Sequence, residues 1–191
     1  MLLLTASAAT PRRASAIGVI EQVSQGSRDS RPDLAYNPAQ SAWLVVWREA
    51  DPATPTTARI VGRLVHRGGL FVGSPVQIEG FRRHTGHPRI AFDGNDGWIV
   101  VWVGGNDPVE PSSSSVEVRA KRVSRIGAPF SSVASVSPTG RSGEANASVF
   151  VGETRSGSTV GRFALVVWEE IVDGRRSVWA RNLSFTSGSS G

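Results

Sequence analysis

The chain has 191 residues and no cysteine, which excludes a disulfide framework and any cysteine-ligated metal site. It has one lysine, Lys121, so nearly all of its positive charge is arginine, and the net charge is +5. This balance favours anionic partners. An arginine bias is more typical of genomic composition, however, and we do not expect a nucleic-acid partner. No apolar run approaches the roughly 20 residues of a membrane-spanning helix, so we predict no membrane span.

The two ends of the chain differ in composition from the middle. Residues 1–15 carry three leucines followed by small residues, and Ala6-Ser7-Ala8 resembles a signal-peptidase site although a positive segment before it is missing. We interpret this stretch as disordered or as the remnant of a signal peptide. Residues 187–191 contain only Ser and Gly and are expected to form a flexible tail. The domain between them spans residues 16–186.

Three short apolar runs share one motif. They read Trp-Leu-Val-Val-Trp at 43–47, Trp-Ile-Val-Val-Trp at 98–102 and Ala-Leu-Val-Val-Trp at 164–168. Their length and their β-branched and aromatic content favour strands, and apolar residues at every position indicate central strands covered on both faces. Core packing between sheets therefore accounts for most of the six tryptophans.

Each run lies within a longer repeat. A strand that starts with proline and ends with Asn or Asp is predicted at 32–37 and 88–93, with a weaker copy at 145–150. Short loops lead to the first two runs, and a longer Gly, Ser and Thr loop is expected at 152–161. Third strands follow at 60–65, 116–123 and 177–183. Fourth elements follow at 72–76 and 126–130, and the third copy has none.

The missing fourth element has a counterpart near the start of the chain. Residues 17–20 (Ile-Gly-Val-Ile) resemble the fourth elements, and Gly18, Gly73 and Gly127 are separated by 55 and 54 residues. We therefore predict an orphan outer strand within 16–30, followed by repeats at 31–80, 87–136 and 144–186. The orphan strand could complete the last sheet, because an unpaired sheet edge promotes aggregation.

Four short motifs between residues 35 and 76 resemble the blade repeat of bacterial secreted and surface β-propeller proteins. They read Ala-Tyr-Asn, Trp-Leu-Val-Val-Trp, Gly-Arg-Leu-Val and Val-Gly-Ser-Pro-Val. The resemblance covers about residues 17–185. It implies an all-β, propeller-like repeat of three four-stranded antiparallel sheets, in an extracellular or periplasmic protein. Propellers have about four to eight blades, so two chains would complete a ring or the chain would belong to a longer array. A β-trefoil or a β-prism is the alternative fold.

Two sets of polar residues are candidates for ligand binding. Asp93 and Asp96 flank a Gly-rich loop that could hold calcium, although a simple turn also explains the composition. Arg63, Arg122 and Arg181 occupy matching places in the third strands and could bind an anionic ligand through their guanidinium groups. The alternative is that they block pairing between sheet edges.

Trp179 and a pair of histidines complete the candidates. Trp179 interrupts the repeat beside Arg181, so it could stack on a sugar ring. His84 and His87 lack a third ligand for zinc and are expected to be solvated loop residues.

No catalytic motif emerges from the sequence. We find no Gly-x-Ser-x-Gly elbow, metal triad or repeated carboxylate pair, and so predict a non-catalytic binding or scaffold module, lectin-like, whose loops at one end of the sheets contact a glycan or protein ligand. One alternative is a glycoside hydrolase or lyase with carboxylates on unequal loops, for which Asp93, Asp96, Glu153 and Glu169 are the candidates. Another is a structural repeat segment of a larger surface protein.

Overall fold

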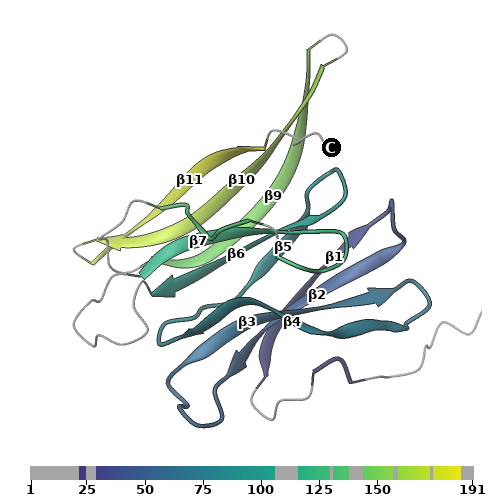
Figure 1. The fold of residues 1–191 in the computed structure, drawn as a ribbon. Coiled ribbons are helices and arrows are strands. Elements are labelled where there is room, and N and C mark those ends of the chain that lie inside the picture. The colour runs from purple at the N-terminus through teal and green to yellow at the C-terminus, as the bar shows by residue number, and fades with distance from the viewer. Residues whose placement is uncertain are drawn as a thin grey trace, which may run out of the picture.

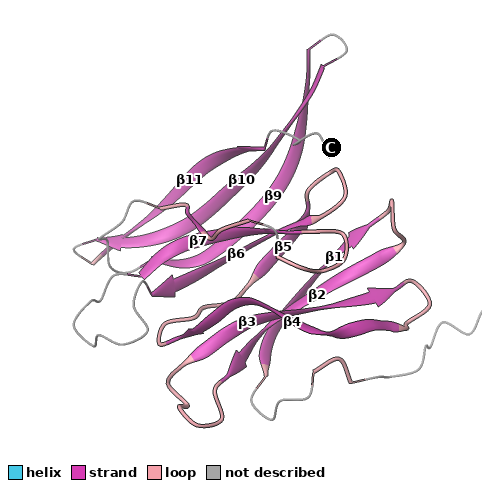
Figure 2. Ribbon diagram, in the orientation of Figure 1, coloured by secondary structure: helices cyan, strands magenta, loops and turns pink. Residues whose placement is uncertain are grey.

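The computed structural model describes residues 22–24, 29–105, 116–129, 131–137, 144–156, 159–172 and 174–185. These residues contain no helix, and their strands form three antiparallel sheets, which confirms the predicted all-β class (Figures 1 and 2). Within this part of the chain, no helix has the length and apolarity needed to cross a membrane. The predicted N-terminal segment 1–15, the orphan strand at 17–20 and the tail at 187–191 lie outside the described residues.

Each sheet is a meander of strands that follow one another in the chain. Sheet A contains β1 (Ser30–Asn37), β2 (Ala42–Ala50), β3 (Ala58–His66) and β4 (Phe71–Arg82). Sheet B contains β5 (Arg89–Phe92), β6 (Trp98–Gly105), β7 (Val116–Val123) and β8 (Ala134–Ser135). Sheet C contains β9 (Glu144–Ser156), β10 (Thr159–Val172) and β11 (Arg175–Phe185). The described strands close neither a barrel nor a ring.

The strand register confirms that the three apolar runs are equivalent. Trp43 lies opposite Val65, Trp98 opposite Val123, and Ala164 opposite Leu183, so the first residue of each run has the same partner position in the third strand. Each run also lies between two strands of its own sheet. The predicted central strands are therefore confirmed.

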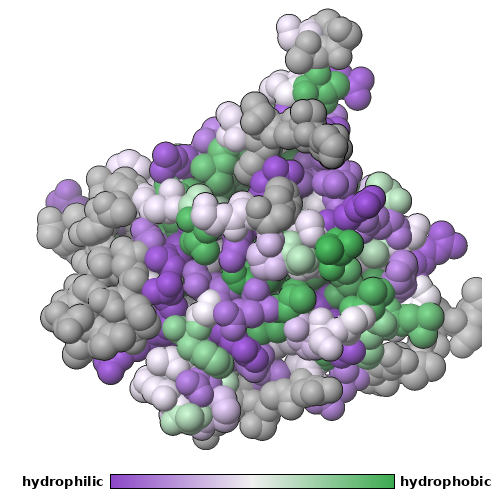
Figure 3. Space-filling model, viewed as in Figure 1, coloured by the Kyte–Doolittle hydropathy of each residue, from purple (hydrophilic) through white to green (hydrophobic). Residues whose placement is uncertain are grey.

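Sheet B lies between sheets A and C, and apolar side chains fill both gaps (Figure 1). All eight residues of β6 are buried. Alternate residues of β6 point to opposite neighbours: Trp98, Val100 and Trp102 pack with Leu44 and Val46 of sheet A, and Ile99 and Val101 pack with Ala164, Val166 and Trp168 of sheet C. The surface seen in Figure 3, by contrast, mixes hydrophilic with hydrophobic residues.

A buried charge network joins sheets A and B. Arg119 on β7 lies 3.0 Å from Glu79 on β4 and 2.8 Å from Glu117. Ser135 donates a hydrogen bond to the second carboxylate oxygen of Glu117 at 2.6 Å. Because buried charges are tolerated only when paired and hydrogen-bonded, this arrangement fixes how the two sheets meet.

The predicted loop at 152–161 is wrong, because β9 and β10 pair through most of it as one long hairpin (Figure 1). Gly152 allows close contact with the Phe163 ring, since a Cβ at this glycine would lie only 2.6 Å from the ring. Glu153 and Arg162 face each other across the strands at 3.2 Å. Glycine here serves a cross-strand aromatic contact rather than a turn.

The fourth element predicted at 126–130 also differs from the structure. Gly127 has a φ of 79° and lies in a turn that is closed by a hydrogen bond from the Ser124 N–H to the Ala128 oxygen at 2.8 Å. Pro129 makes only an isolated bridge to Val123. The fourth strand of sheet B is instead the short β8. The matching Gly73 has a similar φ of 65° but lies within β4, so the conformation of the glycine alone does not decide between strand and turn.

The burial of β6 predicts unequal effects for two tryptophan substitutions. Trp98 is fully buried and donates its indole N–H to the Ala35 oxygen at 3.0 Å, whereas Trp179 is 41% exposed. Trp98→Ala should lower the free energy of unfolding by about 3–5 kcal/mol because it opens a cavity between sheets. Trp179→Ala should cost clearly less. Urea unfolding followed by circular dichroism measures both, and equal losses would contradict the stacking of sheet B between its neighbours.

Candidate functional site

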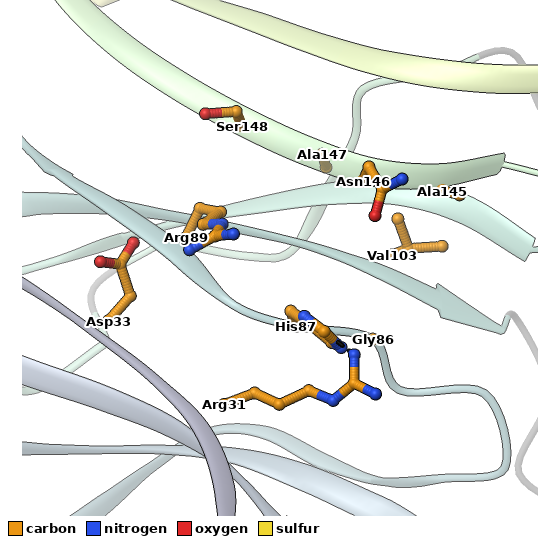
Figure 4. A pocket seen from close by; sticks show the side chains of 10 residues that line it. All are labelled: Arg31, Asp33, Gly86, His87, Arg89, Val103, Ala145, Asn146, Ala147 and Ser148. Atoms are coloured by element: carbon orange, nitrogen blue, oxygen red, sulfur yellow. Dashed lines mark hydrogen bonds between the residues drawn. The ribbon is translucent and has the colours of Figure 1, made fainter.

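A cleft lies where the beginnings of the first strands of all three repeats meet. It encloses about 590 Å³, and Figure 4 shows its side chains arranged around one opening. It is bounded by β1, the segment before β5 and the first residue of β5, one residue of β6, and the start of β9. The lining residues are Arg31, Asp33, Gly86, His87, Arg89, Val103, Ala145, Asn146, Ala147 and Ser148.

Each repeat contributes the same two positions to this cleft. Asp33, Arg89 and Ser148 lie opposite Val46, Val101 and Val167, and these valines hold the same place in the three apolar runs. Arg31, His87 and Asn146 precede the first set by two residues and are therefore equivalent as well. Because β5 packs against both β1 and β9, equivalent side chains converge although successive members of each set are 56 and 59 residues apart in the sequence.

The backbone is distorted at two of these positions. The register of β1 shifts between Ser30 and Asp33, and that of β9 shifts at the equivalent place, opposite Val167 and Glu169. Arg31 and Asn146 have φ values of 61° and 52°. Positive φ is uncommon for residues other than glycine, and β-bulges redirect side chains. Such distortions concentrate at functional sites, which makes the cleft the strongest site candidate.

Arginines determine the charge of the cleft. Arg31 donates a hydrogen bond from Nη1 to His87 Nδ1 at 2.9 Å, so this ring nitrogen is an unprotonated acceptor. Burial, followed by the charges of Arg31, Arg89 and Arg48, lowers the pKa of His87. His87 is thus a partly buried, neutral neighbour of Arg31 in the loop before β5, where a loop histidine was expected.

The one carboxylate among the residues that line the cleft is already hydrogen-bonded. Asp33 accepts the N–H of Leu34 at 3.0 Å with one oxygen and the N–H of Ile90 at 3.1 Å with the other. Within the described part of the chain, neither Arg31 nor Arg89 forms an ion pair with a carboxylate. The cleft therefore presents two guanidinium groups beside the neutral polar side chains of Asn146 and Ser148.

The three arginines predicted as a binding set do not line this cleft. Arg63 donates to the Val23 oxygen at 3.2 Å and stacks on the Phe71 ring, and Arg181 donates to the Val136 oxygen at 2.6 Å. The register shows that Lys121, rather than Arg122, is their equivalent, because Val100 lies opposite Lys121 as Val45 lies opposite Arg63. Arg122 therefore lies one residue after the position that is equivalent to Arg63.

Arg122 instead pairs with Asp93 of its own sheet. The two side chains are 2.8 Å apart, and the other Asp93 oxygen accepts the N–H groups of Asn95 at 2.9 Å and Gly97 at 3.0 Å. Burial raises the pKa of Asp93, but the bonds from Arg122, Asn95 and Gly97 outweigh burial and hold it below its usual range. Asp93 thus closes a turn, as the simpler interpretation of the loop required.

Calcium at Asp93 and Asp96 stays a prediction. A cation at Asp93 would have to displace the guanidinium or the N–H donors, while Asp96 is exposed. The described residues contain no group of three His, Asp or Glu side chains placed to hold a metal ion.

The remaining candidates lie outside the cleft. Trp179 is exposed on β11 opposite Trp168. Of the carboxylates proposed for a hydrolase, Glu153 is paired with Arg162 and Glu169 with Arg176, both at 3.2 Å.

Comparison with known proteins identifies no relative: no protein-family model matches the chain, and no curated protein matches it. No residue role is therefore carried over from another protein. The geometry of the cleft is the observation from which function is inferred.

The Asp93–Arg122 pair predicts a pH-dependent stability. Asp93→Asn keeps an oxygen for the turn, as Asn37 does at the equivalent position, but loses the charge. We expect it to lower the free energy of unfolding at pH 7 by about 1–3 kcal/mol. Because the native pKa is depressed, the wild type loses this advantage as pH falls below about 4, the unfolded value. Urea unfolding from pH 7 to pH 3 measures the difference.

Asp96→Asn is the control for this experiment, because Asp96 is exposed and forms no ion pair with Arg122. Its stability should follow that of the wild type at every pH. A penalty for Asp93→Asn that does not change with pH would contradict the ion-pair explanation.

Proposed function

We propose that this chain is a non-catalytic binding module that recognises an acidic glycan in the cleft formed by the first strands of its repeats. One observation carries the proposal: equivalent positions of all three repeats converge there, and no described carboxylate neutralises Arg31 or Arg89 by an ion pair. Ligand sites are typically clefts of about 300–1,000 Å³ with a few convergent polar groups, and this cleft falls within that range.

The chemistry of the lining favours an acidic sugar. Guanidinium groups bind carboxylate or sulfate through paired hydrogen bonds. The Asn146 amide and the Ser148 hydroxyl can each donate and accept, which suits the hydroxyl groups of a sugar ring. A neutral His87 beside Arg31 leaves the positive charge on the arginines. Guanidinium groups next to an amide and a hydroxyl fit an acidic glycan, which carries both charges and hydroxyl groups, better than they fit an isolated anion.

The finer architecture is part of the same proposal. We infer that the three sheets are propeller-type blades, with β1, β5 and β9 innermost. The meander order of each sheet and the packing of β5 against both other first strands support this arrangement. We propose an extracellular or periplasmic location, because the repeat sequence resembles the blades of secreted and surface propeller proteins.

Calorimetric titration with oligogalacturonate tests the proposed ligand class. Arg31→Ala and Arg89→Ala should each weaken binding about tenfold or more, because each removes a charged hydrogen-bond donor from the cleft. Arg67→Ala is the matched control: it removes the same charge from an exposed turn between β3 and β4. It should leave the affinity within about twofold, and neutral dextran should not bind.

Other results would overturn the proposal. An equal loss for Arg67→Ala would show that net charge alone attracts the polymer. Equal binding of poly-glutamate would assign the cleft to acidic protein segments. If neither oligogalacturonate nor a chondroitin sulfate fragment binds the folded protein at low salt, the cleft is not a glycan site.

A further inference from the structure

The two interfaces between sheets in this chain are built in the same way. We call the side of each sheet that carries the positions of Trp43, Val45 and Trp47 its Trp face, and the opposite side its Leu face. The Trp face of sheet B packs on the Leu face of sheet A, and the Trp face of sheet C packs on the Leu face of sheet B. Each contact therefore joins two unlike faces, always in the same direction.

The Trp face of sheet A and the Leu face of sheet C therefore have no partner sheet among the three described sheets. Trp43 on the Trp face of sheet A is 37% exposed, whereas its equivalent Trp98 is 0% exposed; Trp47 on the same face of sheet A is buried. Leu165 on the Leu face of sheet C is 37% exposed, whereas its equivalents Leu44 and Ile99 are at most 1% exposed. The residues beside them on these two faces include the exposed apolar side chains of Leu34, Phe150 and Val178.

A basic side chain marks where each preceding sheet lies. Lys121 donates to the Ile78 oxygen in β4 at 2.7 Å, and Arg181 donates to the Val136 oxygen beside β8 at 2.6 Å. Both acceptors belong to the outer edge of the preceding sheet. Arg63 makes the equivalent bond to the Val23 oxygen at 3.2 Å. Residues 22–24 thus lie where the outer edge of a sheet docked on sheet A would run.

We propose that the Trp face of sheet A binds the Leu face of sheet C in a second copy of this chain. Sheet C has three described strands where sheets A and B have four, and its edge strand is β11. Docking would bring the segment at 22–24 of one copy to that edge in the other. The contact repeats the geometry already present twice within the chain, and two such contacts close a ring of two copies.

The direction of the contact distinguishes this arrangement from a simple apolar dimer. Two Trp faces packed on each other would bring equivalent residues together, a pairing that neither internal interface uses. An unlike-face contact, by contrast, places exposed apolar residues of both ends against each other and removes them from water. This inference does not rest on glycan binding, because the contact uses the exposed apolar residues of the two end faces, although Ser148 of the cleft, opposite Val167, also lies on the Leu face of sheet C.

Complementation between variants tests the proposal. Leu34→Arg disrupts the Trp face of sheet A, and Val178→Arg disrupts the Leu face of sheet C; these residues are 51% and 79% exposed, so folding should tolerate both changes. Light scattering should give a dimer for the wild type and a monomer for each variant. A one-to-one mixture of the two variants should again contain dimers, because one intact contact remains. Leu70→Arg, at an exposed turn residue outside both faces, should stay dimeric.

Circular dichroism and urea unfolding verify that each variant is folded. A wild type that stays monomeric up to its solubility limit overturns the proposal, as does a folded variant that still dimerises alone. A mixture of folded variants that fails to associate also overturns it. If both variants bind the glycan with the affinity of the wild type, dimer formation and glycan binding are separate properties, and the failure of one proposal does not affect the other.

Discussion

All eight residues of β6 are buried, and the rest of the fold depends on this constraint. A strand that is apolar at every position must be covered by a sheet on each side. Sheets A and C provide this cover, and their own runs need apolar neighbours in turn. Stacking in one direction then follows, because the tryptophan side of each run meets the smaller apolar side of the preceding one. The chain is therefore a short series of like contacts.

Polar groups determine how these apolar faces align. The Glu79–Arg119–Glu117 network holds sheet A against sheet B, and the bonds of Lys121 and Arg181 to main-chain oxygens tie each third strand to the sheet before it. Apolar contacts are non-directional, so they do not select one relative position of two sheets. Buried charges do, because a displaced carboxylate or guanidinium would lose its partners. The regular stacking that creates the cleft rests on these side chains.

Much of the fold could be predicted from the repeat, and most of the candidate site could not. Composition identified the central strands, because burial on both faces leaves a continuous apolar run, and spacing identified the strands that precede and follow most of them. The equivalence of Lys121 with Arg63 was missed, since matching arginines by type ignores the register. Arg31, His87 and Asn146 were missed as a set because equivalent positions carry different side chains. Proline follows the first two, at Pro32 and Pro88, and was the available signal.

The burial of β6 also has a consequence for the order in which the native state opens. Amide protons of its central residues are bonded to β5 and β7 within a sheet that is covered on both faces, so they exchange only in openings that approach complete unfolding. The edge strand β11 has many exposed side chains and a single described neighbour, so it can detach at a much lower cost. Local stability thus falls from the middle of the stack toward its ends. Proteases would cut sheet C long before they reach sheet B.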